Sequence, residues 1–307
     1  VSAPTSHLEL YDLIADGCLR TYNFPVSHPR KPEHAVTLKV IQPRSVLNAS
    51  GMGGFTLNPY VGCPVGCAYC YVPHMTHKQL EDRKWGTYVD VKEGAPELLE
   101  QQLARKRQPA RIFMSTATDP YQPAEERYQI TRRMLEVFER HPKHSLFILT
   151  KQSLVERDID ILTRLPRVAV GMSISIMNDN LARVIEPWAP VTSERLAVIK
   201  RLSEAGIPTY LLWAPAFVPL PMTDKFVRGA ICAIAESGAR ALSLDSLNYR
   251  SRQPAGLTRR LAREGHAPAT KAQAKLIRNE ADRRGLGQRL ELAEPELIED
   301  AEPMLPF

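Results

Sequence analysis

The sequence predicts an α/β fold built on one parallel sheet, and two observations support this prediction. First, six short strand-like runs alternate with segments of helical hydrophobic periodicity. Second, the 307 residues are 44% apolar and 24% charged, which is typical of a globular chain with one large core. Strands that alternate with helices imply parallel pairing and right-handed crossovers, in a sheet that is either open or curled into a barrel.

The elements follow one another along the chain with recognisable start and stop signals. The expected strands are residues 54–60, 111–115, 145–150, 168–174, 209–213 and 241–244. The expected helices are residues 96–105, 124–140, 154–165, 194–205 and 224–236, and a further basic helix covers 270–284. Ser153 and Thr223 are expected N-caps, and Gly206 and Gly238 follow two helix ends. Active groups should gather at the carboxyl ends of the strands.

Composition divides the chain into three expected parts. Residues 1–50 contain several prolines and predict an extended N-terminal arm, and residues 51–248 form the expected barrel or sheet. Residues 249–307 predict a basic helical extension with an acidic tail. Residues 250–290 hold eleven basic and three acidic side chains, a net charge of +8, whereas residues 291–307 hold six acids and no base.

Charge and cysteine usage narrow the class of protein. The net charge of +6 permits an anionic partner such as nucleic acid without requiring one. The longest uncharged stretch, residues 206–223, contains four prolines, so it predicts a buried strand and loop rather than a membrane span. The first residues are acidic and do not resemble a secretory signal. Three of the five cysteines crowd into eight positions, a layout that fits a reducing cytoplasm better than a disulfide scaffold.

The crowded cysteines are Cys63, Cys67 and Cys70, in the pattern C-x3-C-x2-C directly after the first expected strand. Neighbouring glycines allow the tight turns that bring three thiolates to one metal centre, and three thiolates leave a fourth coordination position vacant. Two alternatives stay open. His74 could complete a structural Cys3His zinc site, or the cysteines could simply be buried core residues.

The segment G-C-x3-C-x-Y-C-Y resembles the cysteine loop of the radical S-adenosylmethionine (SAM) superfamily. It is similar in particular to spore photoproduct lyase and the related DNA repair photolyase-like group, over about residues 44 to 219. The resemblance implies a partial (β/α)6 barrel of radical SAM type. It also implies that Cys63, Cys67 and Cys70 hold a [4Fe-4S] cluster whose fourth iron binds SAM, and that a reducing partner such as flavodoxin or ferredoxin supplies electrons.

The same resemblance implies positions for SAM and for radical transfer. The positions that match SAM contacts are Tyr71, Thr118, Asp119, Lys151 and Ser173, with Thr118 and Asp119 for the amino group and Lys151 for the carboxylate. Tyr69 matches a tyrosine that could relay a radical. Glu186 and Arg195 match a stretch of the same group, and we expect them to form a buried pair that braces a loop.

Two positions depart from the pattern. Thr116 stands where the lyase has the cysteine that returns a hydrogen atom to the product radical, and a Thr O–H bond is too strong for this role. Residues 215–224, expected as a loop after the fifth strand, lack a Gly-Leu-Asn segment that relatives often carry there.

Three functions are therefore expected in decreasing order. The first is a radical SAM enzyme that abstracts hydrogen from a small molecule or peptide. The second is a radical SAM enzyme that acts on nucleic acid, to which the basic stretch would bind. The third, of another class, is a nucleic-acid-binding protein stabilised by zinc on the three cysteines and His74.

Overall fold

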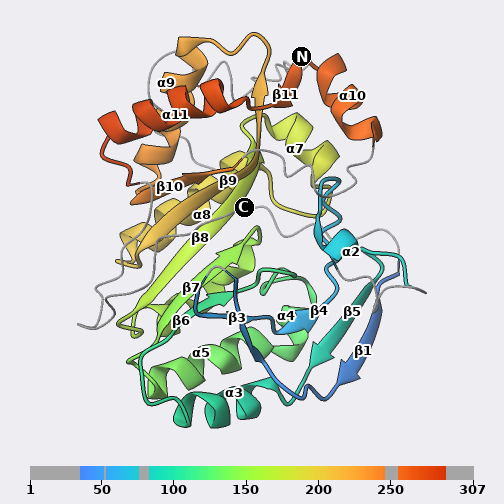
Figure 1. Cartoon of the computed structure of the whole chain (residues 1–307), viewed down its shortest axis with the longest axis vertical. Helices are drawn as coiled ribbons and strands as arrows, with labels where there is room; N and C mark the ends of the chain where they lie inside the picture. Colours follow the sequence, from blue (N-terminus) through green and yellow to red (C-terminus); the bar gives the residue numbers. More distant parts are fainter. Residues whose placement is uncertain (1–34, 52, 76–82, 246–254, 288–307) are drawn as a thin grey trace, which may run out of the picture.

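The computed structural model describes residues 35–51, 53–75, 83–245 and 255–287, and its main sheet contains the predicted parallel strands (Figure 1). From one edge to the other, these strands are β10 (Ala241–Leu244), β9 (Thr209–Pro219), β8 (Val168–Ile176), β7 (Ser145–Thr150), β6 (Arg111–Met114) and β3 (Phe55–Leu57). Every neighbouring pair in this run is parallel. The order of the strands in the sheet is also their order along the chain. The predicted α/β fold with a parallel sheet is confirmed.

Within the described residues, antiparallel strands flank this run without closing it into a barrel. β2 (Leu47–Ala49) pairs with β3, and β11 (His266–Pro268) pairs with the distal part of β9. A separate sheet consists of β1 (Thr37–Ile41), β5 (Tyr88–Lys92) and β4 (Tyr60–Val61), in the order β1-β5-β4. The expected strand 54–60 is therefore two strands in two sheets, because the chain turns at Asn58 and Pro59.

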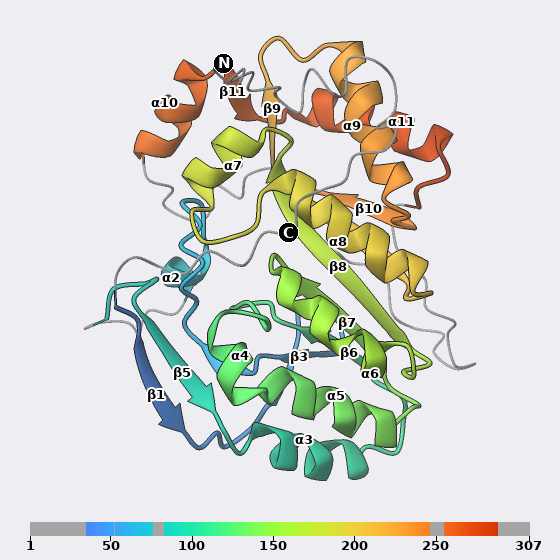
Figure 2. The ribbon, with the colours of Figure 1, turned by 180° about the vertical axis from the view of Figure 1, so that it is seen from behind.

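Helices cover the sheet and connect its strands (Figures 1 and 2). In the described residues they are α2 (Val72–Met75), α3 (Ala95–Ala104), α4 (Ala124–Tyr128), α5 (Ile130–Arg140), the 3-10 helix η1 (Ser153–Asp158), α6 (Ile159–Leu162), α7 (Asp179–Ile185), α8 (Thr192–Glu204), α9 (Asp224–Glu236), α10 (Ala255–Arg263) and α11 (Lys271–Arg283). α3 packs beside α5, and α11 packs beside α9. None of these helices is long and apolar enough to cross a membrane.

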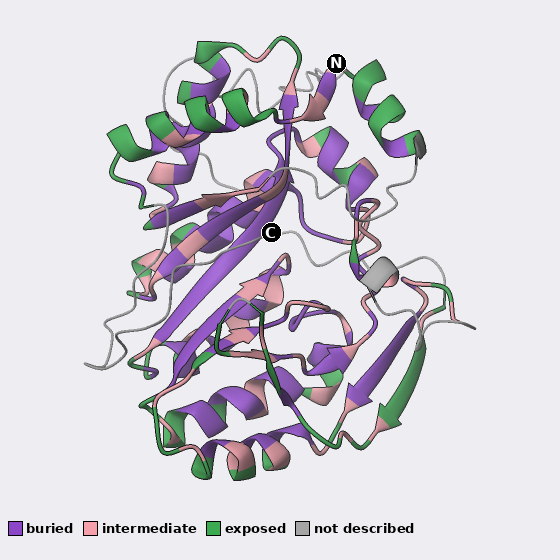
Figure 3. Cartoon of the chain, in the orientation of Figure 1, coloured by how far each residue is buried: buried purple, intermediate pink, exposed green. Residues whose placement is uncertain are grey.

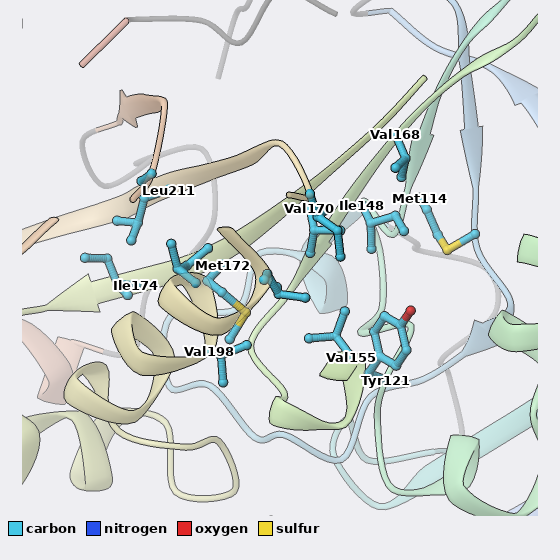
Figure 4. Packing of buried hydrophobic residues seen from close by; sticks show 14 of the residues in the cluster. Met114, Tyr121, Ile148, Val155, Val168, Val170, Met172, Ile174, Val198 and Leu211 are labelled. Atoms are coloured by element: carbon cyan, nitrogen blue, oxygen red, sulfur yellow. The ribbon is translucent and has the colours of Figure 1, made fainter. Parts of the chain in front are cut away.

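The core lies between the sheet and the outer helices, where purple dominates Figure 3. Val170, Met172 and Ile174 alternate along β8 and are fully buried or nearly so. They pack in one cluster with Val198 of α8 and Val155 of η1 (Figure 4). This outward face of β8 anchors the strand.

The opposite face of β8 carries only small side chains: Ala169, Gly171, Ser173 and Ser175. A Cβ atom on Gly171 would lie 2.3 Å from the ring of Tyr210, so this position excludes larger residues. Tyr210 of β9 also donates a hydrogen bond to the Ile148 carbonyl of β7 at 2.9 Å, so its side chain lies over Gly171 of the strand between them. Ser173, nearer the carboxyl end of the strand, stays next to the polar groups described below.

The expected helix 124–140 is broken, and Glu125 explains the break. Gln129 takes a left-handed conformation, with φ of 50°, between α4 and α5. The Glu125 carboxylate accepts hydrogen bonds from the backbone N–H groups of Thr131 at 2.9 Å and Arg132 at 3.1 Å. These donors begin α5 and have no partner within it, so the carboxylate caps a new helix.

Other helix ends test the cap predictions. Thr223 accepts from the Phe226 N–H at 3.2 Å and caps α9 as expected. Ser153 is wrong as an N-cap, because η1 already begins there and Gln152 precedes it without a side-chain cap. Gly206, with φ of 84°, donates to the Ser203 carbonyl at 2.9 Å and ends α8 as expected. The expected helix 154–165 is shorter, because η1 and α6 replace it.

Residues 215–224 also differ from expectation. β9 continues through Pro219, where β11 pairs with it, so half of the expected loop is strand. The boundaries at residues 50 and 248 stay predictions. The first 34 residues of the expected arm and the acidic tail 291–307 lie outside the described residues.

Candidate functional site

The cysteine loop follows β4, and glycines shape its turns. Gly62 has φ of 85°, and a Cβ atom there would lie 2.3 Å from the Tyr88 carbonyl oxygen, so only glycine fits. Gly66, with φ of 71°, lies against Trp188. The Cys70 N–H donates to the Cys67 carbonyl at 3.1 Å, which forms a turn between the last two cysteines.

The three thiols of this loop are free and sit in a common environment. Burial raises the pKa of Cys63, with a further increase from the charge of Asp119. Burial also raises the pKa of Cys67 to about 12 and that of Cys70, although the nearby Lys151 opposes both shifts. Each of these thiols is therefore a protonated group that a metal centre would have to deprotonate on binding.

The number of thiols on this loop matches what an iron–sulfur cluster with one open iron requires. Within the described residues, no three thiol, imidazole or carboxylate groups lie close enough to share one metal ion. A [4Fe-4S] cubane places each thiolate on a different iron, so it needs free thiols from one short loop rather than three ligands on a single ion. The side chain of His74, the fourth ligand of the zinc alternative, lies outside the described residues.

The loop after β6 binds the cysteine loop at two places. The Tyr71 hydroxyl donates to the carbonyl of Thr116, and the Thr118 hydroxyl donates to the Gly62 carbonyl at 2.6 Å. The Tyr71 side chain keeps contact with solvent, since the residue is 39% exposed. Thr116, the position of the lyase's hydrogen donor, thus lies beside an accessible tyrosine.

Asp119 organises the ends of β6 and β7. Its Oδ1 accepts from the Thr150 hydroxyl at 2.6 Å and the Tyr121 N–H at 3.0 Å, and its Oδ2 accepts from the Lys151 N–H at 2.9 Å. Burial raises the pKa of Asp119, while these hydrogen bonds oppose the increase. Oδ2 keeps one acceptor position, which is what a contact with an amino group would need.

Lys151 and Ser173 meet across neighbouring strands. The Lys151 Nζ donates to the Ser173 Oγ at 2.9 Å and lies 4.0 Å from a carboxylate oxygen of Glu186. Its ammonium group also lies 5.8 Å from the centre of the Tyr69 ring. The predicted SAM residues Lys151 and Ser173 are thus brought together, one residue beyond β7 and within β8.

Glu186 and Arg195 form the expected buried pair, and both residues are completely buried. Arg195 donates to Glu186 at 2.5 Å, to the Ser173 carbonyl at 2.7 Å and to the Pro190 carbonyl at 2.7 Å. Tyr69 donates its hydroxyl to Glu186. The pair therefore braces the loop after α7, as expected, and also holds the tyrosine next to the last cysteine.

The electrostatics of this group follow from burial and charge. Burial, and then the charge of Glu186, raise the pKa of Tyr69 well above its ordinary value. Burial by itself raises the pKa of Glu186, but Arg195 and Lys151 together outweigh it, so the net shift is downward. Tyr69 thus stays a neutral phenol bound to a carboxylate that can accept its proton.

Three residues of the site were missed. Asn58 accepts from the Ala117 N–H at 3.0 Å and so fixes the loop after β6, and Lys92 donates to the Asn58 carbonyl at 2.8 Å. Ser115 is buried in a left-handed conformation, with φ of 73°, directly before Thr116. The Asn-Pro pair after the first strand was the signal that could have identified Asn58 as a turn residue.

Comparison with known proteins identifies the family. The model of the radical SAM superfamily matches residues 57–218. A protein of Methanocaldococcus jannaschii is 34% identical over 177 residues, which are 58% of this chain and 64% of that protein. A protein of Mycobacterium tuberculosis is 29% identical over 203 residues, 64% of this chain and 59% of that protein. The match thus spans less than two thirds of either relative.

Two further comparisons concern a radical SAM isomerase and spore photoproduct lyase. The radical SAM Nalpha-GlyT isomerase of Pseudomonas phage M6 is 28% identical over 181 residues, 59% of this chain and 36% of the isomerase. The structure of spore photoproduct lyase with dinucleoside spore photoproduct has a TM-score of 0.56 and 17% identity, over 81% of this chain and 78% of the lyase. The lyase shares the fold. Since the family model covers more than half of the sequence, the chain belongs to the radical SAM superfamily, whose enzymes use a [4Fe-4S] cluster and SAM.

Proposed function

We propose that Cys63, Cys67 and Cys70 hold the [4Fe-4S] cluster and that SAM binds at the ends of β6, β7 and β8. The observation that carries this proposal is the set of three partly buried, free thiols, two of which, Cys67 and Cys70, lie within reach of the charge of the Lys151 ammonium group. When bound, the cluster and SAM supply a 5′-deoxyadenosyl radical that abstracts a hydrogen atom from an organic substrate.

The residues of the chain bind and orient SAM in this proposal. Lys151 moves its ammonium group from Ser173 to the SAM carboxylate, while Oδ2 of Asp119 and the hydroxyl of Thr118 accept from the amino group. Ser173 and Tyr71 contact the rest of SAM. The Tyr69 phenol, bound to Glu186, is the proposed radical relay, since loss of its electron can be coupled to proton transfer to the carboxylate.

A small molecule or a peptide is the substrate class that we favour. Thr116 replaces the thiol that a thymine-dimer repair reaction uses, so a reaction without thiol-based hydrogen return fits this chain better. The basic helix α11 supports the same view, because its arginines contact the protein itself. Arg284 bonds Glu280 at 3.2 Å, and Arg283 bonds the same carboxylate.

Nucleic acid is the second candidate substrate. The similar lyase binds a dinucleoside spore photoproduct, and α11 still exposes Lys271 and Lys275. Filter binding across a salt series separates the two candidates. If the wild-type slope of log affinity against log salt corresponds to several phosphate contacts, nucleic acid is favoured, provided that the slope is halved when Lys271, Lys275 and Arg278 are replaced together. Weak binding that the replacement leaves unchanged would favour the small molecule or peptide.

The proposed reaction also implies a partner and a compartment. A low-potential electron donor such as flavodoxin or ferredoxin would reduce the cluster, and the cytoplasm is the compartment in which such donors and reduced thiols coexist. The zinc alternative is not retained, because the family uses an iron–sulfur cluster.

Anaerobic incubation with SAM and dithionite tests the function. We expect 5′-deoxyadenosine, with a larger yield when the correct substrate is present. Absence of 5′-deoxyadenosine from protein that carries iron and acid-labile sulfide would contradict the proposal, as would stoichiometric zinc without iron after anaerobic purification.

A further inference from the structure

Helices α7 and α10 form a layer next to the cysteine loop. The Ala68 N–H donates to the Ile185 carbonyl, at the end of α7, at 2.8 Å. Leu257 and Leu261 of α10 belong to the same buried apolar cluster as Ile185, and Cys67 packs against this cluster. Figures 1 and 2 both show α10 beside α7. The exposed side of this layer is therefore protein surface close to the proposed cluster ligands.

The exposed side of the layer is cationic. Leu257 and Leu261 are one turn apart and turn one face of α10 inward, which leaves its arginines on the outer face, green in Figure 3. The exposed cations of the layer are Arg183, Arg259, Arg260 and Arg263. Two acids are nearby: Glu264 is exposed, whereas Asp179 accepts from the Ser193 N–H at 3.1 Å. The layer thus carries an excess of positive charge.

The cations of this layer differ from those of α11. On α11, Arg283 and Arg284 bond Glu280, and Arg278 lies 3.5 Å from the Leu244 carbonyl that accepts its hydrogen bond. Across the ranges that the structure describes, Arg260 and Arg263 have no ion pair. Both extensions are basic, but the described arginines of α11 have partners within the chain, whereas Arg260 and Arg263 of α10 stay open to a partner outside it.

We propose that this layer, centred on Arg260 and Arg263, is the docking surface for an acidic electron-transfer protein that reduces the cluster. The inference rests on the proposed function. The donor loses one electron and the cluster gains it, so no bond forms or breaks. A donor on this layer is separated from Cys67 by one layer of helices, and a short separation favours electron transfer.

The position of the layer favours a protein donor over nucleic acid. A substrate must reach the strand ends, where Tyr71 is accessible beside Thr116. The layer instead lies against Cys67 and Ala68. Opposite charge on the donor speeds the encounter and orients it, and this effect weakens with salt.

A charge-reversal pair tests the docking surface directly. Arg260→Glu combined with Arg263→Glu is compared with Lys271→Glu combined with Lys275→Glu, which changes the net charge equally on α11. The probes are purified flavodoxin and a plant-type ferredoxin, and interferometry measures their Kd with the cluster-loaded protein. We expect the α10 variant to raise the Kd of at least one probe by about 5- to 30-fold at low salt, and the α11 variant by less than about twofold. The difference should shrink at about 0.5 M salt.

A second measurement separates docking from folding. SAM cleavage driven by dithionite, a small reductant that needs no docking, should be the same in wild type and both variants. Cleavage driven by flavodoxin and its reductase should show a raised KM for flavodoxin in the α10 variant only. Circular dichroism spectra that match the wild type would confirm that both variants fold.

Several outcomes would overturn the inference. These are equal donor affinity in the two variants, no measurable binding of either donor to the wild type, or loss of duplex DNA binding in the α10 variant while donor binding is unchanged. The last result would make the layer a nucleic-acid surface. Failure of the proposed function is distinguishable, because the wild type would then produce no 5′-deoxyadenosine even with dithionite.

Discussion

Glu125 and Glu186 are both completely buried, and each accepts a hydrogen bond from a tyrosine hydroxyl, yet their surroundings differ. Each carboxylate oxygen of Glu125 has two donors, so its acceptor positions are filled. The donors to Glu125 are Tyr60, Thr131, Arg132 and Arg157. This closed network joins β4, α5 and η1 and leaves nothing for a ligand.

Each oxygen of Glu186 has one close donor, Tyr69 or Arg195, and Lys151 lies 4.0 Å away. The charges of Glu186, Arg195 and Lys151 all act on the Cys67 thiol. The difference teaches that burial of charge alone does not mark a functional site. A buried network becomes a candidate site where acceptors and a cation remain for a ligand.

Among the substitutions that we predict, loss of a cysteine thiol should have the largest effect on iron content and SAM cleavage. Cys63→Ala, Cys67→Ala and Cys70→Ala should each abolish the brown colour, the roughly four irons per chain and SAM cleavage, because each thiolate holds one iron. Iron assay and absorbance spectra measure this after anaerobic reconstitution. Cys232→Ala, in α9, is the control and should keep its iron. Full iron content in any of the three variants would contradict the assignment of that ligand.

Replacement of the two glutamates tests the comparison directly. Glu125→Ala and Glu186→Ala should each lower the free energy of unfolding by about 3 to 5 kcal/mol, because each leaves buried partners without their counter-charge. Urea denaturation measures this effect. Only Glu186→Ala should also change SAM affinity, and Glu186→Gln, which keeps the side-chain volume, serves where the alanine variant does not fold. Equal loss of SAM affinity in the Glu125 variant would contradict the distinction.

Lys151 is the cation of the open network. Lys151→Ala should weaken SAM binding about 10- to 150-fold, the usual consequence of losing a charged hydrogen bond of about 1.5 to 3 kcal/mol. The iron content should stay unchanged, because the predicted contact is with the SAM carboxylate. Lys143→Ala, an exposed lysine bonded to the Lys106 carbonyl, is the matched control for titration calorimetry. Unchanged SAM affinity would leave Lys151 as a structural residue.

Lys92 is a buried cation, in contrast to the two buried carboxylates. Burial lowers its pKa to about 8. The folded protein then releases this proton at a lower pH than the unfolded chain, so stability should rise with pH above about 8 and level off near the ordinary lysine pKa. Relative to Lys92→Met, the free energy of unfolding should gain about 1.5 kcal/mol between pH 8 and pH 9.5. Parallel pH profiles for the two proteins would show that Lys92 is solvated in the folded state.

Much of the fold could be predicted from local sequence. Apolar runs of four to seven residues between helical patterns identified the strands from β6 to β10, because each is largely buried between the interior and a layer of helices. The exposed strand β1 and its partner β5 were missed. The residues of β1 are almost all exposed, so no hydrophobic pattern marks this strand, and its pairing depends on β5, which lies about 50 residues later.

The sequence by itself determined the cysteine loop and the alternation of strands and helices, because spacing and periodicity are properties of neighbouring residues. The Glu186–Arg195 pair was expected from the family resemblance. Only the tertiary structure decided which polar groups meet. Asn58 accepts from the Ala117 N–H, and Lys151 donates to Ser173. Arg284, at the end of α11, bonds Glu280, whereas Arg260 and Arg263 of α10 have no ion pair within the described residues. The physical reason is that a hydrogen bond or an ion pair requires two atoms within about 3 to 4 Å. Residues far apart in the sequence reach that distance only after the strands and helices have packed.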